Sequence, residues 1–314
     1  MVKNTEQMKR EKTMKGKYLS PKADLTFKLV FAEHKDLMMS FLNALLPLPE
    51  NAPITSIDYL TPEMVPENDG KKNSVVDVRC TDALKRHFIV EMQMQWSESF
   101  KRRVVMNSAK AVIKQVGEGE NFMLLRPVFS LNIVNQNIPD EAPDEYYHDY
   151  AILNVAHPER SIDYLRLVFV ELPKFQPRNI MEKKMAVLWL RFLTEINEET
   201  VEAPLELLEN EQIRKALSIV EKSAMTDEQL YAYERFWDAI NVENALAEDR
   251  FNRGLEEGRA EGEAKGRAEG EAKGRAEGRA EERLANARSL KANGVPLDII
   301  AKSLALSTEE LAQL

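Results

Sequence analysis

Residues 74–80 read Ser-Val-Val-Asp-Val-Arg-Cys, and residues 87–95 read His-Phe-Ile-Val-Glu-Met-Gln-Met-Gln. Both stretches are rich in β-branched and aromatic residues and alternate between two kinds of side chain, which predicts two strands with one buried face each. Successive side chains of a strand point to opposite faces, so Asp77 lies on the face opposite to Cys80. By the same rule Glu91 lies opposite to Met92. Each strand therefore carries one acid on the face opposite to its apolar side chains.

The segment between the two strands, residues 81–86, is polar and has the length of a hairpin loop, which predicts antiparallel pairing. If Thr81 faces His87, then Asp77 faces Glu91, and the two carboxylates stand about 5 Å apart on one face of the sheet. Like charges at that distance require a cation or a proton between them. The pair therefore predicts a metal site, with two ordinary solvated acids as the alternative.

The chain of 314 residues is long enough for one domain with appendages, and 44% hydrophobic residues supply a core. Its net charge of −9 is unevenly distributed. Residues 1–136 carry 20 Lys and Arg against 16 Asp and Glu, whereas residues 137–253 carry 13 against 24 and residues 254–314 carry 10 against 12. The section with the acid pair is thus the basic one, which suits an anionic substrate. A pI near 5.3 excludes a uniformly basic protein that coats DNA.

The composition also predicts the compartment. Cys80 is the single cysteine and cannot form an internal disulfide, so we expect a small core residue. No apolar run approaches the roughly 20 residues of a membrane helix. The N-terminus is basic and lacks the apolar segment of a secretory signal. We therefore expect a cytoplasmic protein without a membrane partner.

The pattern of residues predicts an α/β unit around a mixed sheet, in the order helix, three strands, helix, strand. The helices are expected at residues 24–46 and 97–116, and the strands at 54–60, 74–80, 87–95, 127–134 and 164–171. The predicted organisation is a disordered basic arm (1–17), the α/β domain (18–180), an acidic helical region (181–253), a glycine repeat (254–282) and a small helical module (283–314). We expect the acidic helical region to support the domain or to cover its basic face.

Glycine recurs at every fourth position from Gly254 to Gly278. Glu–Lys and Glu–Arg pairs at i,i+4 add about 0.2–0.5 kcal/mol each to a helix, but each glycine costs about 0.8–1 kcal/mol relative to alanine. A lone helix should therefore be weak. Packing of two glycine stripes along a right-handed seam would stabilise it, and this predicts an oligomerising helix. The alternative is a flexible linker.

The last predicted module contains three short helices, with breaks at Gly294 and Pro296 and a cap at Ser307. Its final two helices have helix-turn-helix spacing. The last helix carries Glu309 and Glu310 and no basic residue, so a protein contact is expected there instead of DNA reading.

Several motifs occur in a characteristic order between residues 18 and 290. They are Lys-Ala-Asp-Leu-Thr-Phe-Lys at residues 22–28, Phe31, Asp77, the triplet Glu91-Met92-Gln93, Arg103, Gln-Val-Gly-Glu-Gly-Glu-Asn-Phe at residues 115–122, the strand 127–134 and the glycine repeat. In this order and spacing the chain resembles the Rpn family of recombination-promoting nucleases, also described as putative transposases, within the PD-(D/E)XK nuclease superfamily.

The resemblance implies a restriction-endonuclease-like core and metal-dependent cleavage of DNA phosphodiester bonds. It implies that Asp77 and Glu91 hold Mg²⁺, or another divalent cation such as Mn²⁺ or Ca²⁺, with the carbonyl of Met92 as an extra ligand. A hard cation takes such oxygen ligands. Gln93 stands where many relatives carry a catalytic lysine. It could orient water or a phosphate oxygen, but it offers no charge.

The resemblance leaves the source of the missing positive charge open between Arg103 and Lys28. Asp24 would complete the site from the first helix, or would instead cap that helix, and Gln115 could reach the site from the second helix. The family often has a Tyr-Tyr pair three residues after the helix arginine, where this chain has Met106 and Asn107. That departure puts the substrate contacts in question more than the metal site. His87 shares the site face, but we do not count it as catalytic.

Together these features predict a divalent-metal-dependent DNA endonuclease that contacts the phosphate backbone and reads little sequence. Its tail would self-associate and pair two active domains, in recombination, transposition or defence. The alternative is a catalytically degenerate nuclease fold that acts as an oligomeric interaction module. In a third possibility, the acidic region masks the basic face.

Overall fold

The structure, a computed structural model, describes residues 16–60, 75–117, 119–139, 141–177, 184–312 and 314, with the backbone alone at 75–77 and 308. The predicted basic arm 1–17 lies outside these residues except for its last two positions. There the amide N–H of Gly16 donates to the carbonyl of Glu198, and that of Lys17 donates to the carbonyl of Thr200, both at 2.8 Å. The start of the described chain is thus bound to the helical region.

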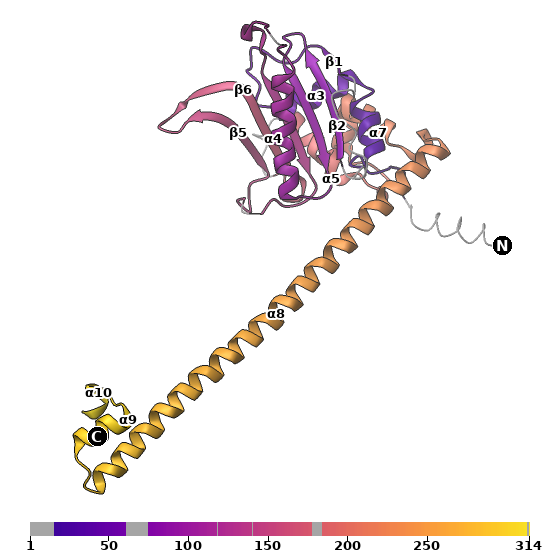
Figure 1. The fold of residues 1–314 in the computed structure, drawn as a ribbon. Helices are drawn as coiled ribbons and strands as arrows, with labels where there is room; N and C mark the ends of the chain where they lie inside the picture. Colours follow the sequence, from indigo (N-terminus) through magenta and orange to yellow (C-terminus); the bar gives the residue numbers. More distant parts are fainter. Residues whose placement is uncertain (1–15, 61–74, 118, 140, 178–183, 313) are drawn as a thin grey trace, which may run out of the picture. The chain divides into compact units, whose positions relative to one another are not determined.

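The domain is built on a six-stranded mixed sheet in the order β1-β2-β3-β4-β6-β5 (Figure 1). The strands are β1 (Ile57–Tyr59), β2 (Val75–Asp82), β3 (His87–Gln93), β4 (Val128–Val134), β5 (Tyr147–Asn154) and β6 (His157–Glu171). β3 pairs antiparallel with β2 and parallel with β4, and β4 pairs parallel with β6. The predicted mixed α/β fold, of restriction-endonuclease-like type, is confirmed.

The predicted register of the hairpin is also confirmed. Asp77 pairs with Glu91, and Thr81 pairs with His87. The turn is closed by Asp82, whose carboxylate accepts from the Nε of Arg86 at 2.7 Å. Cys80 is buried on the opposite face, as its place in the alternation predicts, and burial raises the pKa of its thiol to about 12.

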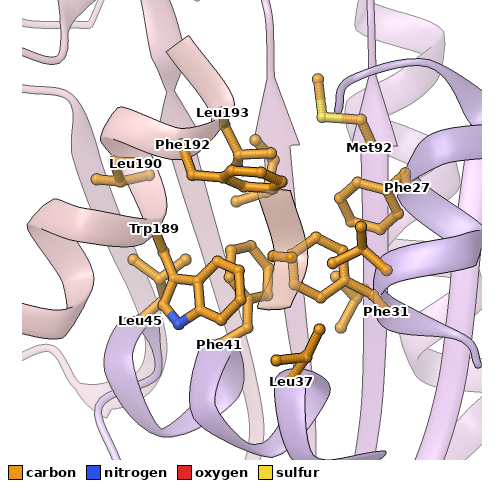
Figure 2. Packing of buried hydrophobic residues seen from close by; sticks show 14 of the residues in the cluster. Phe27, Phe31, Leu37, Phe41, Leu45, Met92, Trp189, Leu190, Phe192 and Leu193 are labelled. Atoms are coloured by element: carbon orange, nitrogen blue, oxygen red, sulfur yellow. The ribbon is translucent and has the colours of Figure 1, made fainter. Parts of the chain in front are cut away.

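One face of the sheet is covered by α2 (Asp24–Phe31), α3 (Lys35–Leu45), α5 (Lys184–Glu195) and α7 (Glu211–Ile219). Aromatic rings from α2, α3 and α5 form the centre of this core (Figure 2). The centroids of the Phe31 and Phe41 rings are 4.4 Å apart, and the ring of Trp189 lies 5.3 Å from that of Phe31. Burial of these large side chains supplies the main stabilisation of the domain.

The single helix predicted over residues 24–46 is wrong, because two helices occupy this segment. The backbone of His34 is extended, with φ −121° and ψ 94°, and its Nδ1 lies 2.9 Å from the carbonyl of Leu29. The break allows α2 and α3 to fold against each other, so that Phe27 and Phe31 meet Phe41 in one core. Tertiary packing here outweighs a helical periodicity that continues through the break.

The other face of the sheet carries α4 (Glu98–Ile113) (Figure 1). The hydroxyl of Ser97 accepts from the N–H of Phe100 and so caps its start. Phe100 and Val104 pack on Val134 and Phe169 of the sheet. This packing fixes which residues of α4 face β3.

The acidic helical region is part of the same core, which agrees with the expected supporting role. Trp189, Phe192 and Leu217 are buried beside α2 and α3. The region also contains α6 (Leu205–Glu209), and short 3₁₀ turns occur at Phe122–Leu124, Leu172–Lys174 and Lys222–Ala224. The first compact unit ends at Val242.

The sheet differs from the prediction at its far edge. β5 was not predicted, and β6 begins at His157 instead of residue 164. Most residues of β5, and the first eight of β6, are exposed, so they lack the alternation by which a half-buried strand is recognised.

Helix α8 (Asp227–Ala292) contains 66 residues, including the whole glycine repeat, and the second compact unit begins within it at Glu243. A capping box stabilises its start. The N–H of Gln229 donates to the hydroxyl of Thr226 at 3.2 Å, and the N–H of Thr226 donates to the side chain of Gln229 at 2.9 Å. The repeat is thus helical rather than a linker without structure.

The end of the chain also follows the predicted breaks. Gly294 has φ +82° after α8, and α9 (Leu297–Leu304) and α10 (Thr308–Leu311) follow. Ser307 and Glu310 form the expected reciprocal cap, and Glu310 also pairs with Arg283 at 2.9 Å. None of the helices in the described ranges has the length and apolarity needed to cross a membrane.

Candidate functional site

Glu91 is a charged residue in the centre of the sheet. β3 lies between β2 and β4, and the side chain of Glu91 is only 1% exposed. A buried carboxylate is costly unless neighbouring groups compensate its charge. The partners that surround Glu91 therefore define the candidate site.

Two residues of α4 reach Glu91. The Nη2 of Arg103 lies 3.8 Å from Oε2 of Glu91, and the Nδ2 of Asn107 donates to Oε1 at 3.3 Å. Positions 103 and 107 are one helical turn apart and share a face of α4. The Arg103 guanidinium also lies 5.1 Å from the centre of the Phe100 ring, which orients it toward the sheet.

Gln93 is held in the same group. Its Oε1 accepts from the Nη2 of Arg103 at 2.9 Å, and its Nε2 donates to the carbonyl of Gln95 at 2.8 Å. Gln93 thus positions Arg103, and its amide has a second N–H that can donate to another acceptor. Gln93 is neutral and links the charged Arg103 of α4 to the end of β3.

Asp77 and Met92 belong to the site through the backbone. The register sets Asp77 directly beside Glu91, and Met92 beside Val76. Cβ atoms of directly opposite residues are about 4.5–5.5 Å apart, which is the spacing expected of two carboxylates that share an ion. The structure thus agrees with the backbone arrangement on which the predicted metal site depends.

Asp24 is the first residue of α2 and forms an ion pair with Lys28 at 2.7 Å. The N-cap residue is Ala23, so the alternative role of Asp24 as a helix cap is wrong. An acid in the first turn is favourable because of the helix dipole. Lys28 is exposed and already paired with this acid, so the structure favours Arg103 over Lys28 as the charge beside Glu91.

The structure does not bring Gln115 to this group. Its side chain donates to the carbonyl of Arg126 at 3.1 Å and accepts from the N–H of Arg126 at 2.8 Å. It lies eight residues beyond Asn107, or about 12 Å further along the helix direction. Gln115 thus fastens the loop that leads into β4, at the end of the sheet away from Gln93.

Asn107 was missed as a site residue, although the sequence marks its position as a departure from the family. Its spacing of four from Arg103 could have placed it on the same face. Asn132 was missed as well. It is fully buried beside Glu91 in the parallel pairing, and its amide donates to the carbonyl of Val168 at 3.0 Å. A polar residue at alternate positions of an apolar strand was the available signal.

A second polar cluster on this face of the sheet has a structural role. The carboxylate of Glu171 is fully buried and accepts from the amide of Ile138 at 2.6 Å and from Lys174 at 2.8 Å, with the Nε2 of His148 at 2.6 Å. These partners compensate its charge and tie β5 to β6.

The donor set around Glu91 fits a hard divalent cation. A buried carboxylate, a second acid in register and a backbone carbonyl are the oxygen ligands that such ions prefer. In the part of the chain whose side chains are described, no three His, Cys, Asp or Glu residues gather closely enough for a metal site. The candidate site therefore depends on the two acids of the hairpin and the carbonyl of Met92.

Comparison with known proteins assigns the chain to a family. No curated protein and no solved structure matches the sequence. Residues 21–246 match the family described as "PD-(D/E)XK nuclease family transposase". The match includes the hairpin, α4 and all candidate site residues, and it spans more than half of the chain. The chain therefore belongs to the PD-(D/E)XK nuclease family of transposases.

Proposed function

We propose that this protein is a divalent-metal-dependent DNA endonuclease of the Rpn type. Membership of the family makes it a nuclease-related hydrolase with DNA as the implied substrate, and PD-(D/E)XK nucleases generally use divalent metal ions. The observation that carries the proposal is the buried carboxylate of Glu91, set in register with Asp77 and approached by Arg103 and Asn107.

Asp77, Glu91 and the carbonyl of Met92 would hold the ion, with Mg²⁺ as the first choice and Mn²⁺ or Ca²⁺ as alternatives. When bound, such an ion polarises the phosphoryl group and lowers the pKa of the attacking water. Asn107 holds one oxygen of Glu91 by donating to it, which fixes the direction of the carboxylate. Asp24 stands in the first turn of α2 as a further candidate acid.

Gln93 and Arg103 act together in this proposal. Gln93 accepts from Arg103 and thereby holds a positive charge next to Glu91. The guanidinium would stabilise negative charge that develops on the phosphoryl oxygens. The remaining amide N–H of Gln93 would donate to water or to a phosphate oxygen.

We further propose that the glycine-repeat segment of α8 self-associates and pairs two active domains, so that both strands of a duplex can be cut. Added Cβ atoms at the repeat glycines would meet nothing within 4 Å in the single chain, so these positions leave room for the close approach of a second helix. Recombination, transposition or defence would then be the setting of the reaction.

The test is cleavage of supercoiled plasmid by the full chain with Mg²⁺ and with EDTA. We expect nicking or linearisation with Mg²⁺ only, and a loss of at least about 10³-fold in Asp77→Asn and Glu91→Gln. Asp58→Asn is the matched control, because Asp58 is an exposed strand acid paired with Lys35 at 3.0 Å. Calorimetric titration of Mg²⁺ into the same proteins reports binding of the ion independently of cleavage.

The outcomes separate the two candidate functions. If wild-type protein binds no divalent ion and leaves plasmid intact, the chain is the degenerate interaction module that the neutral Gln93 would allow. If Asp77→Asn and Glu91→Gln cleave as fast as wild type, the acids of the hairpin do not form the active site.

A further inference from the structure

Lys22 belongs to the Lys-Ala-Asp motif that precedes α2, and the site described so far does not use it. Its side chain is half-buried, and its Nζ donates to the Oδ1 of Asn135 at 3.1 Å. Asn135 directly follows β4, and its backbone N–H donates to the carbonyl of Gln93 at 2.9 Å. The Lys22 ammonium therefore lies at the carboxyl ends of β3 and β4, at the level of the residue that replaces the catalytic lysine.

The charge of Lys22 is poorly compensated. Among the described residues its ammonium forms no ion pair, and its hydrogen-bond partner is a neutral amide. Lys28 and Lys174, by contrast, pair with carboxylates at 2.7 and 2.8 Å. Burial lowers the pKa of Lys22, and the negative charge of Glu198 only partly opposes this effect. A desolvated cation beside a neutral group gains most from an incoming anion.

Arg103 alone does not supply a full positive charge for a bound phosphate at the carboxyl ends of β3 and β4. Its Nη2 is engaged by Gln93, and the carboxylate of Glu91 lies within ion-pair distance. Part of the positive charge of Arg103 therefore compensates the negative charge of Glu91. Among the described residues no carboxylate forms an ion pair with Lys22. Asn135 links Lys22 to the backbone of Gln93, because it accepts from the Lys22 ammonium and donates to the Gln93 carbonyl.

We propose that Lys22 contacts a backbone phosphate of the bound nucleic acid at the carboxyl ends of β3 and β4, and so supplies the positive charge that Gln93 lacks. This inference rests on the proposed nuclease function. The lysine then comes from the turn before α2, whereas the Glu-x-Lys arrangement places it two residues after the acid on the same strand. Asn135 holds the amine in place before the phosphate arrives.

The experiment compares Lys22→Met, Lys22→Arg and Lys222→Met in the full chain. Lys222 is the matched control, because it is also partly buried and its Nζ donates to the carbonyl of Gly16 at 2.7 Å. Burial lowers the pKa of Lys222 too, and the charge of Glu198 opposes this effect. Affinity for a short fluorescent DNA duplex is measured in EDTA at several NaCl concentrations. Loss of one phosphate contact should reduce the slope of log Kd against log [NaCl] by about 0.9.

We expect Lys22→Met to reduce that slope and to slow Mg²⁺-dependent plasmid cleavage by about 10²-fold. Lys22→Arg should keep the slope, and Lys222→Met should change neither quantity. Thermal unfolding shows whether each variant is folded, and Lys22→Gln replaces Lys22→Met if the latter is not.

The inference is overturned if Lys22→Met keeps the wild-type slope, or if Lys222→Met lowers it equally. If wild-type protein binds DNA without cleaving it, the proposed function fails while the slope still decides the role of Lys22. If wild-type protein neither binds nor cleaves DNA, both are overturned.

Discussion

The balance of charge around Glu91 depends on a few atoms. Asn107 donates to its Oε1 at 3.3 Å, and Arg103 approaches its Oε2 at 3.8 Å. A neutral amide can satisfy a carboxylate without adding charge of its own. Asn107 therefore stabilises the buried acid and leaves its negative charge available to a cation.

Asn107→Asp should make the protein depend on a divalent ion for stability. A second carboxylate would replace the donor next to Glu91, and like charges at that distance repel. Without metal we expect a loss of about 1–3 kcal/mol in the free energy of unfolding. Saturating Mg²⁺ should then raise Tm more than in wild type, because the ion binds the folded state more strongly. Thermal unfolding with EDTA and with Mg²⁺ measures both effects.

Asn107→Ala is the control, since it removes the donor without adding charge. It should cost less stability and should show no increase in the Mg²⁺-induced rise of Tm. Equal Mg²⁺ responses in the two variants would mean that position 107 does not border a cation site.

Single-residue reasoning succeeded where the geometry is local. The pairing of Asp77 with Glu91 follows from strand alternation and a short loop, and the observed register agrees. The roles of Asn107 and Gln115 follow instead from how α4 lies on the sheet, which depends on Phe100 and Val104 packing against β4 and β6. The spacing of four places Asn107 on the same face of the helix as Arg103, but it does not show how that face meets β3.

At the scale of elements, burial decides which strands and helices could be predicted. β2 is recognisable because its side chains alternate, and β3 and β4 are recognisable as short apolar runs, which the structure buries on both faces. β5 and the start of β6 are exposed and gave no such pattern. The sequence pattern also continues through the break between α2 and α3, since Val30, Leu37 and Phe41 keep a helical spacing although they lie on two helices.

The glycine repeat of α8 makes a prediction about one element. Replacement of Gly262, Gly266 and Gly270 by alanine should stabilise the helix by about 0.8–1 kcal/mol per site, since the new Cβ atoms meet nothing within 4 Å. The same methyl groups should weaken self-association by holding two backbones apart. Circular dichroism during heating measures the first effect, and sedimentation equilibrium of the full chain measures the second.

Ala264→Gly and Ala268→Gly provide the matched control, because these alanines lie between the repeat glycines and off their stripe. They should lower helicity and leave the stripe intact. If the alanine replacements at the glycines strengthen association, the stripe is not the contact between chains.

At the scale of the whole molecule, the basic and acidic residues are concentrated in different sections of the chain. The basic first section contains the candidate site, and the helices that follow residue 183 contribute Trp189 and Leu217 to the core of the domain. Composition could not show that these helices belong to the same domain, because their buried side chains pack against α2 and α3 only in the folded chain. The family match, which ends at residue 246, agrees with this extent.

Truncation after Asn252 tests whether the domain cleaves DNA by itself and whether the glycine-repeat tail pairs two active domains. The shortened chain keeps Tyr233, whose hydroxyl accepts from the N–H of Ser20 at 2.8 Å, so its Tm should stay close to that of the full chain. It should retain Mg²⁺-dependent cleavage but yield nicked circles, since linearisation at one place requires two active domains. Agarose electrophoresis of a plasmid time course distinguishes the two products, with Asp77→Asn in the shortened chain as the control. Linear product formed at the rate of the full chain would show that the glycine-repeat tail does not pair the active domains.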